Sequence, residues 1–367
     1  MNPMPRVTIA VPPRAYDAVI ENGALAAAGS HLRDLLRERG KLFVVTVSTV
    51  RKKWGKRLLA SLAASGFVTS VLEMPDGEPA KKLATVELLA EKLVRLGADR
   101  NSIIVAFGGG VVGDVAGLLA SIYMRGIDVV QVPTTVLAQV DAAIGGKTGV
   151  NLKAGKNLLG TFHQPRAVLI DPQVLTSLPE REYRAGLYEA LKCGIIGSLE
   201  LFQRFEDDKD KILNRDPALL ETIITDSVKL KAQIVVADER EMGMRRFLNL
   251  GHTIGHALEV ETGYRTLLHG EAVAYGMIAA TNIALSSGKL DSVTAGRIAD
   301  AVLGLGKLPR IAIRSRNVYK RLASDKKTRD GVIHFVLPVE IGKVEVISGV
   351  TEKIVLAAID ELRHLAG

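Results

Sequence analysis

The clearest structural signal in the chain is SIIVAFGGGVVGDVAGLLASIY, residues 102–123. A continuous apolar run leads into Gly108, Gly110 and Gly113, and an apolar stretch of helical character follows. Glycines at this G-x-G-x-x-G spacing permit a tight turn from a strand into a helix and let backbone N–H groups approach a pyrophosphate. The same glycines also suit such a turn without a ligand. The stretch therefore predicts strand, turn and helix, with a dinucleotide as the candidate ligand.

The first half of the chain repeats this alternation of short apolar runs with longer amphipathic ones. Strand-like runs occupy 41–47, 67–72, 128–133 and 166–170, and helix-like stretches occupy 83–96 and 115–123. Continuous apolar strands that alternate with helices indicate a parallel sheet covered on both faces. We expect an α/β, Rossmann-like nucleotide-binding domain over residues 1–178. The glycine turn follows several strands instead of opening the fold, which departs from the usual Rossmann order.

The second half has a different periodicity. Helical patterns cover 182–196, 218–236, 250–261 and 270–285, and strand signals nearly vanish until VIHFVLP at 332–338. Pro179 precedes the first of these helices, which places the expected boundary beside it. We expect an all-α, metal-binding domain over residues 179–367, with a ligand in the cleft between the two domains.

Composition narrows the class of partner. The 367 residues include 48 Lys and Arg against 40 Asp and Glu, a net charge of +8, which favours anionic partners. Aromatic residues make up only 4% of the chain, and no basic tract is interleaved with them, so the sequence argues against nucleic-acid binding. A phosphorylated metabolite fits the charge better.

The chain has one cysteine, Cys193, which forms no internal disulfide and no thiolate metal site by itself. The N-terminal sequence lacks an apolar run behind a basic start, and no stretch approaches the roughly 20 apolar residues that cross a bilayer. We expect a cytoplasmic protein that does not associate with a membrane.

The segment from Asp141 to Thr148, DAAIGGKT, resembles a P-loop whose first glycine is replaced by aspartate. A carboxylate there would repel phosphates, so we reject an ATPase. The glycine-rich run GGKTGVNLKAGKN that includes it carries Lys147, Lys153 and Lys156. Ammonium groups among glycines suit anion binding, and a solvated basic loop is the alternative.

A candidate metal site lies in the helical half. His252 and His256 are four residues apart, on one face of a helix, and His269 begins the next helical segment. Glu189 occupies an otherwise apolar helix, where a buried carboxylate needs a cation or hydrogen-bond donors. Nitrogen and oxygen ligands without thiolate suit a catalytic zinc with one position open for substrate.

Further polar residues lie on apolar segments near these candidates: Lys192, Lys231, Arg245 and Asn249. Any one of these residues, taken alone, could be an ordinary polar residue on the surface. Together they predict a pocket with one metal, several cations and few compensating anions, which suits a substrate with two negative ends.

An ordered set of motifs carries a family resemblance. The motifs are DGEPAK (76–81), GGGVVGD (108–114), VPTT (132–135), GGKTGVN…GKN (145–157), GLYEALK (186–192), RRFLNLGHTIGHALE (245–259), LLHGEA (267–272) and DKK (325–327). This set resembles the 3-dehydroquinate synthase family of sugar phosphate cyclases.

The resemblance implies that Glu189, His252 and His269 bind zinc, for which cobalt is a possible substitute. His256, a ligand by spacing alone, then becomes a substrate-binding or proton-handling residue. The implied NAD contacts are Asp76, Gly77, Glu78, Lys81, Gly110, Val111, Val112, Gly113, Asp114, Thr134, Thr135, Asp141, Lys147 and Lys156. The implied substrate-binding and catalytic residues are Arg125, Lys147, Asn157, Lys192, Lys231, Arg245, Asn249, His256 and one lysine of the DKK run, Lys326 or Lys327.

The implied activity is that of a carbon–oxygen lyase of the shikimate pathway of aromatic amino-acid biosynthesis, working as a homodimer. It converts 3-deoxy-D-arabino-heptulosonate 7-phosphate to 3-dehydroquinate and phosphate. The alternatives are a cyclase acting on sedoheptulose 7-phosphate or glucose 6-phosphate, a polyol dehydrogenase of the glycerol dehydrogenase type, and a non-enzymatic binding module. Arg245, Asn249, His256 and the DKK run, all present here, favour the carboxylated substrate, and Glu189 stands where the dehydrogenases typically have aspartate.

Overall fold

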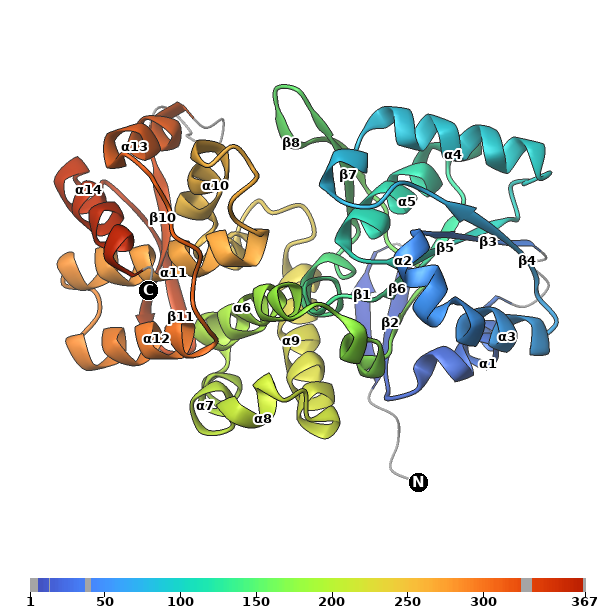
Figure 1. Ribbon diagram of the computed structural model, residues 1–367, viewed down its shortest axis with the longest axis horizontal. Coiled ribbons are helices and arrows are strands. Elements are labelled where there is room, and N and C mark those ends of the chain that lie inside the picture. Colours follow the sequence, from blue (N-terminus) through green and yellow to red (C-terminus); the bar gives the residue numbers. More distant parts are fainter. Residues whose placement is uncertain (1–5, 13, 37–40, 325–331, 366–367) are drawn as a thin grey trace. The chain divides into compact units, whose positions relative to one another are not determined.

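The computed structural model describes residues 6–12, 14–36, 41–324 and 332–365 (Figure 1). The chain divides into two compact units. Unit 1 comprises Met1–Leu178 and Pro217–Glu239, and unit 2 comprises Pro179–Asp216 and Arg240–Gly367. The long helix α9 (Pro217–Ala237) packs against the first strand of unit 1. The expected assignment of all of 179–367 to the second domain is therefore wrong for α9, because a tertiary contact and not its place in the chain decides where it belongs.

Within the described residues, unit 1 contains a seven-stranded sheet. In spatial order its strands are β1 (Arg6–Val11), β2 (Arg14–Ile20), β9 (Ala167–Ile170), β6 (Asp128–Pro133), β5 (Ile103–Gly108), β3 (Lys41–Thr46) and β4 (Val68–Glu73). All neighbours from β2 to β4 pair in parallel. This confirms the parallel sheet expected from the continuous apolar runs.

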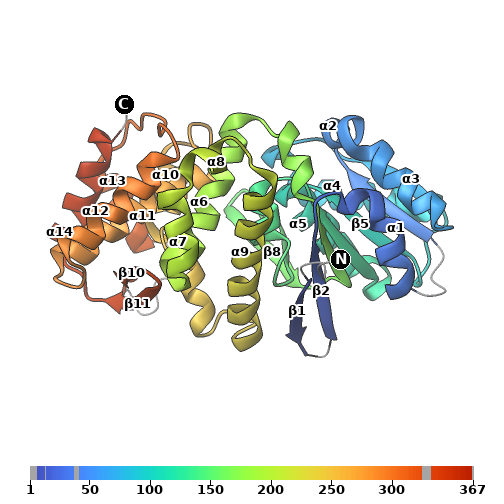
Figure 2. The same ribbon diagram turned by 90° about the horizontal axis from the view of Figure 1, so that it is seen from below.

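The antiparallel pair β1–β2 at one edge of the sheet was not predicted (Figure 2). Buried and exposed residues alternate along β1, with Val7, Ile9 and Val11 inside. This period of two is the signal that identifies a half-buried strand.

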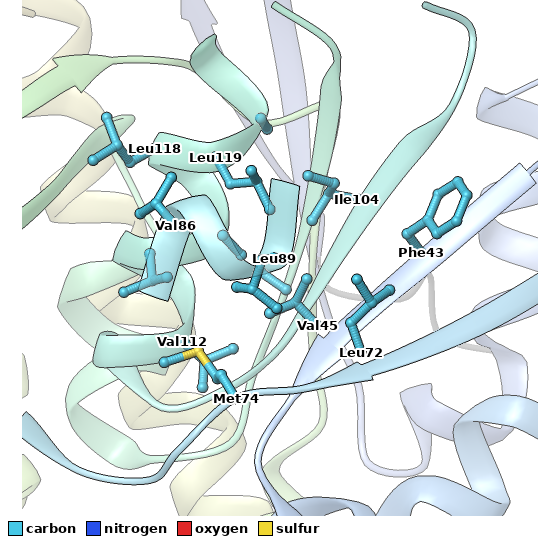
Figure 3. Packing of buried hydrophobic residues seen from close by; sticks show 14 of the residues in the cluster. Phe43, Val45, Leu72, Met74, Val86, Leu89, Ile104, Val112, Leu118 and Leu119 are labelled. Carbon is cyan, nitrogen blue, oxygen red and sulfur yellow. The ribbon is translucent and has the colours of Figure 1, made fainter. Parts of the chain in front are cut away.

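Helices α4 (Leu83–Arg95) and α5 (Gly110–Ile122) share one apolar core with the sheet (Figure 3). Phe43 and Val45 of β3 point into this core, as does Ile104 of β5, because alternate strand residues face the same side. Helices α1 (Ala24–Leu35) and α3 (Lys56–Ala64) pack on each other and contact β9 and β4, respectively. The short helix α2 (Ser48–Val50) follows β3.

The glycine-rich segment after Asp141 is not an open loop. It forms a separate antiparallel hairpin, β7 (Lys147–Leu152) and β8 (Gly155–Phe162). The chains approach so closely that a Cβ at Gly160 would lie 2.0 Å from the carbonyl oxygen of Thr148. Gly160 is therefore needed for strand pairing. This explains part of the high glycine content of the segment after Asp141, which had suggested a loop.

Unit 2 is helical, as expected, apart from one hairpin. Its helices are α6 (Glu180–Gly197), α7 (Leu199–Asp207), α8 (Lys209–Leu213), α10 (His252–Glu261), α11 (His269–Ser286), α12 (Ser292–Gly304), α13 (Ser315–Ser324) and α14 (Glu352–Glu361). Strands β10 (His334–Glu340) and β11 (Lys343–Ser348) pair antiparallel, so the domain is not strictly all-α. No helix in the described part of the chain is long and apolar enough to cross a membrane.

Helices α6, α10 and α11 approach one another through glycines. A Cβ at Gly276 of α11 would lie 1.8 Å from the carbonyl oxygen of Gly251, and a Cβ at Gly270 would lie 1.8 Å from that of Ala185 in α6. A Cβ at Gly255 of α10 would lie 2.9 Å from the carbonyl oxygen of Ala272. Gly251 itself has φ 78, which favours glycine. No larger residue fits at these contacts without moving a helix.

We predict that Gly276→Ala destabilises the protein by about 3 kcal/mol, because its methyl group would overlap a backbone carbonyl that has no rotamer to escape into. The matched control is Gly296→Ala in α12, where a Cβ would meet no atom within 4 Å. That exposed change should stabilise the helix by about 0.5–1 kcal/mol. Urea unfolding of both variants checks the prediction, and equal stabilities would contradict it.

Candidate active site

The carboxyl ends of the parallel strands of unit 1 lie at one edge of the sheet. Gly108 at the end of β5 pairs with Pro133 at the end of β6, and the N–H of Thr134 donates to the carbonyl of Gly108 at 2.9 Å. Helix α5 begins at Gly110, immediately after this turn. The edge therefore gathers residues expected to contact NAD: Asp76 and Gly77 after β4, Gly110 to Asp114 after β5, and Thr134 and Thr135 after β6.

Packing requires one of the three motif glycines, Gly108. A Cβ at Gly108 would lie 2.5 Å from Val112, and one at Gly113 would lie 2.9 Å from Oε1 of Gln131. At Gly110 the nearest atom is Cβ of Ala142 at 3.5 Å, an ordinary contact. Because Gln131 can move its side-chain end away from Gly113, packing explains Gly108 without a ligand and leaves Gly110 unexplained.

The buried Lys81 is the centre of a polar network in unit 1. Its Nζ lies 2.5 Å from Oδ2 of Asp114 and donates to Oδ1 of Asn157, also at 2.5 Å. Burial raises the pKa of Asp114, and the ammonium of Lys81 opposes that shift. The ion pair keeps a carboxylate in the first turns of α5, beside the glycine turn.

The same network holds the β7–β8 hairpin. The backbone N–H of Asn151 donates to the carbonyl of Lys81 at 2.8 Å, and its side-chain Nδ2 donates to Oε1 of Glu78 at 2.7 Å. Nζ of Lys156 lies 3.9 Å from the same Glu78 oxygen. The structure thus brings together the predicted residues Glu78, Lys81, Asp114, Lys156 and Asn157.

Asp141, the residue that argued against a P-loop, is paired with Lys231 of α9. Nζ of Lys231 lies 2.7 Å from Oδ1 of Asp141 and also donates to its backbone carbonyl. The sequence placed Lys231 beside the metal candidates of the helical half, but the structure places it in unit 1, because α9 packs there. Burial is the main cause that raises the pKa of Asp114 in the Lys81 network, and the nearby charge of Asp141 adds to it.

Arg125 and Lys147 are exposed. Arg125 ends a short turn in which Met124 (φ 46) and Arg125 (φ 69) both adopt left-handed backbone conformations. Such conformations cost free energy for residues with side chains.

The metal candidates of unit 2 lie on three helices, α6, α10 and α11 (Figure 1). His252 begins α10, His256 lies one turn later, and His269 begins α11. One nitrogen from each imidazole lies within 4.8 Å of the others. Glu189 lies in the middle of α6 and is only 1% exposed.

The carboxylate of Glu189 faces two of the histidines. Its Oε1 lies 3.7 Å from Nε2 of His252 and 3.7 Å from Nε2 of His269. This buried oxygen accepts no hydrogen bond from any group in the described ranges, and Oε2 forms an ion pair with Nζ of Lys192. Ligand atoms around a tetrahedral zinc are about 3.3 Å apart, so these three atoms fit one cation with little movement.

Two donor sets therefore share this site: the three histidines, or Glu189 with His252 and His269. The unsatisfied oxygen of Glu189 favours the second set, because a buried carboxylate oxygen without a donor is costly unless a cation binds it. The sequence's reassignment of His256 to the substrate side is compatible with this geometry and remains a prediction.

The electrostatic environments of the two facing histidines differ. Burial lowers the pKa of His252 well below the ordinary histidine value, and the ammonium of Lys192 lowers it further. Burial also acts to lower the pKa of His269, but contacts with Glu259 and Glu189 outweigh it and raise that pKa. His252 is thus neutral at pH 7, the form of imidazole that binds a metal.

Three further predicted residues of unit 2 are Lys192, Arg245 and Asn249. Lys192 is 1% exposed and Arg245 is 2% exposed. Nδ2 of Asn249 donates to Oε1 of Glu241 at 2.5 Å. Lys326 lies outside the described residues.

Sequence reasoning missed two acidic residues, Glu241 and Glu259. Glu259 is 2% exposed, and its Oε1 lies 3.6 Å from Nδ1 of His269. Its position seven residues after His252 puts both on one face of α10, which was a readable signal. Glu241 lies in an irregular segment with φ 61, where spacing indicates no partner.

These features define a class of protein: an α/β unit with a dinucleotide-type glycine turn, joined to a helical unit in which half-buried histidines and a buried carboxylate could bind a metal. Models of the 3-dehydroquinate synthase N-terminal and C-terminal domains match residues 71–185 and 186–328. The chain belongs to the 3-dehydroquinate synthase family.

Individual relatives agree with this assignment. A 3-dehydroquinate synthase from Koribacter versatilis (strain Ellin345) is 55% identical over 363 residues, 99% of each chain. Among solved structures, a 2-epi-5-epi-valiolone synthase from Streptomyces hygroscopicus subsp. jinggangensis 5008, with NAD+ and Zn2+ bound, superposes with a TM-score of 0.88 at 32% identity, covering 97% of this chain and 98% of that one. A 2-deoxy-scyllo-inosose synthase complexed with carbaglucose-6-phosphate, NAD+ and Co2+ gives 0.86 at 27% identity, covering 97% and 99%.

We predict that Lys81→Met destabilises the protein by about 2 kcal/mol, because it leaves the carboxylate of Asp114 buried without its ammonium partner. Adding Asp114→Asn should recover part of that loss, since the second change removes the unpaired charge. Chemical unfolding of the two single variants and the double variant measures the coupling. Strictly additive effects would contradict a direct interaction.

Proposed function

We propose that this chain is a 3-dehydroquinate synthase, a carbon–oxygen lyase that converts 3-deoxy-D-arabino-heptulosonate 7-phosphate to 3-dehydroquinate and phosphate. The observation that carries the proposal is the buried Oε1 of Glu189 facing His252 and His269, in a chain 55% identical to a 3-dehydroquinate synthase. The reaction places the protein in the shikimate pathway of aromatic amino-acid biosynthesis.

We propose NAD and zinc as its cofactors, with cobalt able to replace zinc. Two solved relatives carry NAD+ with Zn2+ or Co2+, and the residues of this chain fit both groups. The glycine turn and the Glu78, Lys81 and Asp114 network suit the dinucleotide. Glu189, His252 and His269 suit the metal, because they offer one carboxylate oxygen and two imidazole nitrogens without thiolate.

The proposed substrate has two anionic ends, a phosphate and a carboxylate, which need cations to bind them. Lys192 and Arg245 are nearly fully buried and supply fixed positive charge in unit 2. Charges held in a desolvated site stabilise anions without reorganisation, which is the main way such residues assist a reaction. We assign Arg125, Lys147, Asn157, Lys231, Asn249 and Lys326 to substrate binding as well.

When bound, NAD supplies a reversible acceptor for the hydride at C5 and zinc supplies a Lewis acid at the C5 hydroxyl. The side chains of the protein bind and orient the substrate and move its protons. The Lys192 ammonium lies against Glu189, where it favours deprotonation of a hydroxyl placed beside it. His256 belongs to the same cluster as His252 and His269 and is our candidate for moving a proton to or from the substrate.

Phosphate elimination needs little from the chain beyond positioning. A phosphate oxygen of the substrate takes the C6 proton as phosphate leaves, so the cations have only to hold both anionic groups. The later ring closure joins two carbons of one molecule, which again depends on orientation. Because the hydride is returned in each cycle, no NADH accumulates.

We further propose that the enzyme is cytoplasmic and acts as a homodimer. Its one cysteine, Cys193, is buried and forms no disulfide, which suits a reducing compartment. Sedimentation of the purified chain tests the dimer.

We predict that the pure protein with NAD and zinc releases phosphate from 3-deoxy-D-arabino-heptulosonate 7-phosphate without net formation of NADH. Sedoheptulose 7-phosphate and glucose 6-phosphate, which lack the carboxylate, should release at least 100-fold less, the factor expected when about 3 kcal/mol of charge pairing is lost. Parallel assays of phosphate and of absorbance at the NADH band measure both. Preference for another sugar phosphate, or stoichiometric NADH, would contradict the proposal.

We predict that chelation abolishes phosphate release and that zinc or cobalt restores it, because Glu189, His252 and His269 would hold a metal that acts as a Lewis acid on the reacting hydroxyl. Thermal unfolding of the chelated protein serves as the control that the fold survives. Full turnover in protein shown to be free of metal would rule out the proposed site.

A further inference from the structure

The imidazole of His269 lies between two buried carboxylates. Its Nε2 is 3.7 Å from Oε1 of Glu189, and its Nδ1 is 3.6 Å from Oε1 of Glu259. Glu259 is 2% exposed and projects from α10, whereas His269 begins α11. The two nitrogens of this ring therefore have different partners.

His252 repeats the same arrangement. Its Nδ1 lies 3.1 Å from the backbone carbonyl oxygen of Leu250, and its Nε2 lies 3.7 Å from Oε1 of Glu189. A neutral imidazole has one N–H donor and one lone pair. In the neutral form that a metal binds, an acceptor near each Nδ1 favours the proton there and leaves the lone pair on each Nε2, the nitrogen nearer Oε1 of Glu189.

We propose that Glu259 is a positioning residue of the metal site: its carboxylate accepts the Nδ1 proton of His269 and thereby orients Nε2 toward the cation. The inference rests on the proposed metal site and extends it to a residue that does not bind the metal. Partners of this kind fix the orientation of a ligating histidine, and their loss typically weakens metal binding by about 10- to 100-fold.

The position of Glu259 on α10 supports this role. It follows His252 by seven residues, so one face of α10 carries a ligand and also the residue that orients the ligand of α11. The close contact of the two helices at Gly255 and Ala272 holds these groups together. A purely structural role for Glu259 would instead require only a buried charge pair between the helices, and metal affinity separates the two possibilities.

The test is zinc affinity, measured by competition with a chromogenic chelator on the full chain stripped of metal. Glu259→Met retains the length of the side chain but has no acceptor, and we expect about 10- to 100-fold weaker zinc binding. Glu259→Gln retains a neutral acceptor and should bind zinc with intermediate affinity. The matched control is Glu261→Gln on the same helix, because Glu261 pairs with Arg321 and Asn317 and not with a histidine.

The visible absorption of the cobalt-loaded protein is a second readout, and it should change in Glu259→Met and not in Glu261→Gln. Unchanged zinc affinity and an unchanged cobalt spectrum in Glu259→Met would overturn the inference, even if that variant unfolded at a lower temperature. If Glu259→Met does not fold, the same two results in Glu259→Gln overturn it. A wild-type protein that binds no zinc would instead refute the metal site itself.

Discussion

The close approach of α10 and α11 is the constraint on which the metal site depends. The two helices meet where a Cβ at Gly276 would lie 1.8 Å from the carbonyl oxygen of Gly251, and α11 meets α6 at Gly270 in the same way. His252 follows Gly251 and His269 precedes Gly270, while Glu189 lies one turn after Ala185, the residue that Gly270 contacts. Each ligand candidate is thus adjacent, in sequence or by one helical turn, to a backbone contact that admits no side chain.

The positive charge evident in the sequence is partly balanced inside the protein. Three nearly buried lysines each lie against a carboxylate: Lys81 with Asp114, Lys231 with Asp141, and Lys192 with Glu189. Burying both charges of such a pair costs desolvation free energy, which apolar side chains in the same positions would not cost. Their presence at the sheet edge and at the metal candidates is what a site for anionic ligands requires, since each ammonium is already fixed and desolvated before a ligand binds.

The sequence predicted those parts of the fold that local periodicity controls. The apolar strands β3, β5 and β6 and the long helices α4, α6 and α11 appear where the patterns indicated, because burial on both faces of a sheet or along one face of a helix leaves a regular signature. The membership of α9 in unit 1 could not be predicted in this way, because its pattern specifies a helix but not the strand it packs against. The hairpin β7–β8 was obscured because its glycines are needed for strand pairing and look like a loop.

The sequence was sufficient to predict which residues form the candidate site but not how their atoms are arranged. Spacing grouped His252 with His256, the apolar helix around Glu189 made that carboxylate a further candidate, and only the family resemblance removed His256 from the ligands. The two donor sets differ in which histidine nitrogens face an acceptor and which face Oε1 of Glu189. These directions depend on how three helices, which are far apart in the sequence, pack together. Glu259 had a helical spacing that could have been read, but its partner His269 lies on another helix.

X-ray absorption at the zinc edge of the wild-type protein tests the central claim, that Glu189, His252 and His269 converge on one cation. The account predicts scattering from two imidazole rings and one carboxylate oxygen at about 2.0–2.1 Å, with the remaining position filled by water or substrate. Scattering from three imidazole rings and no carboxylate would contradict it, since His256 would then bind the metal in place of Glu189.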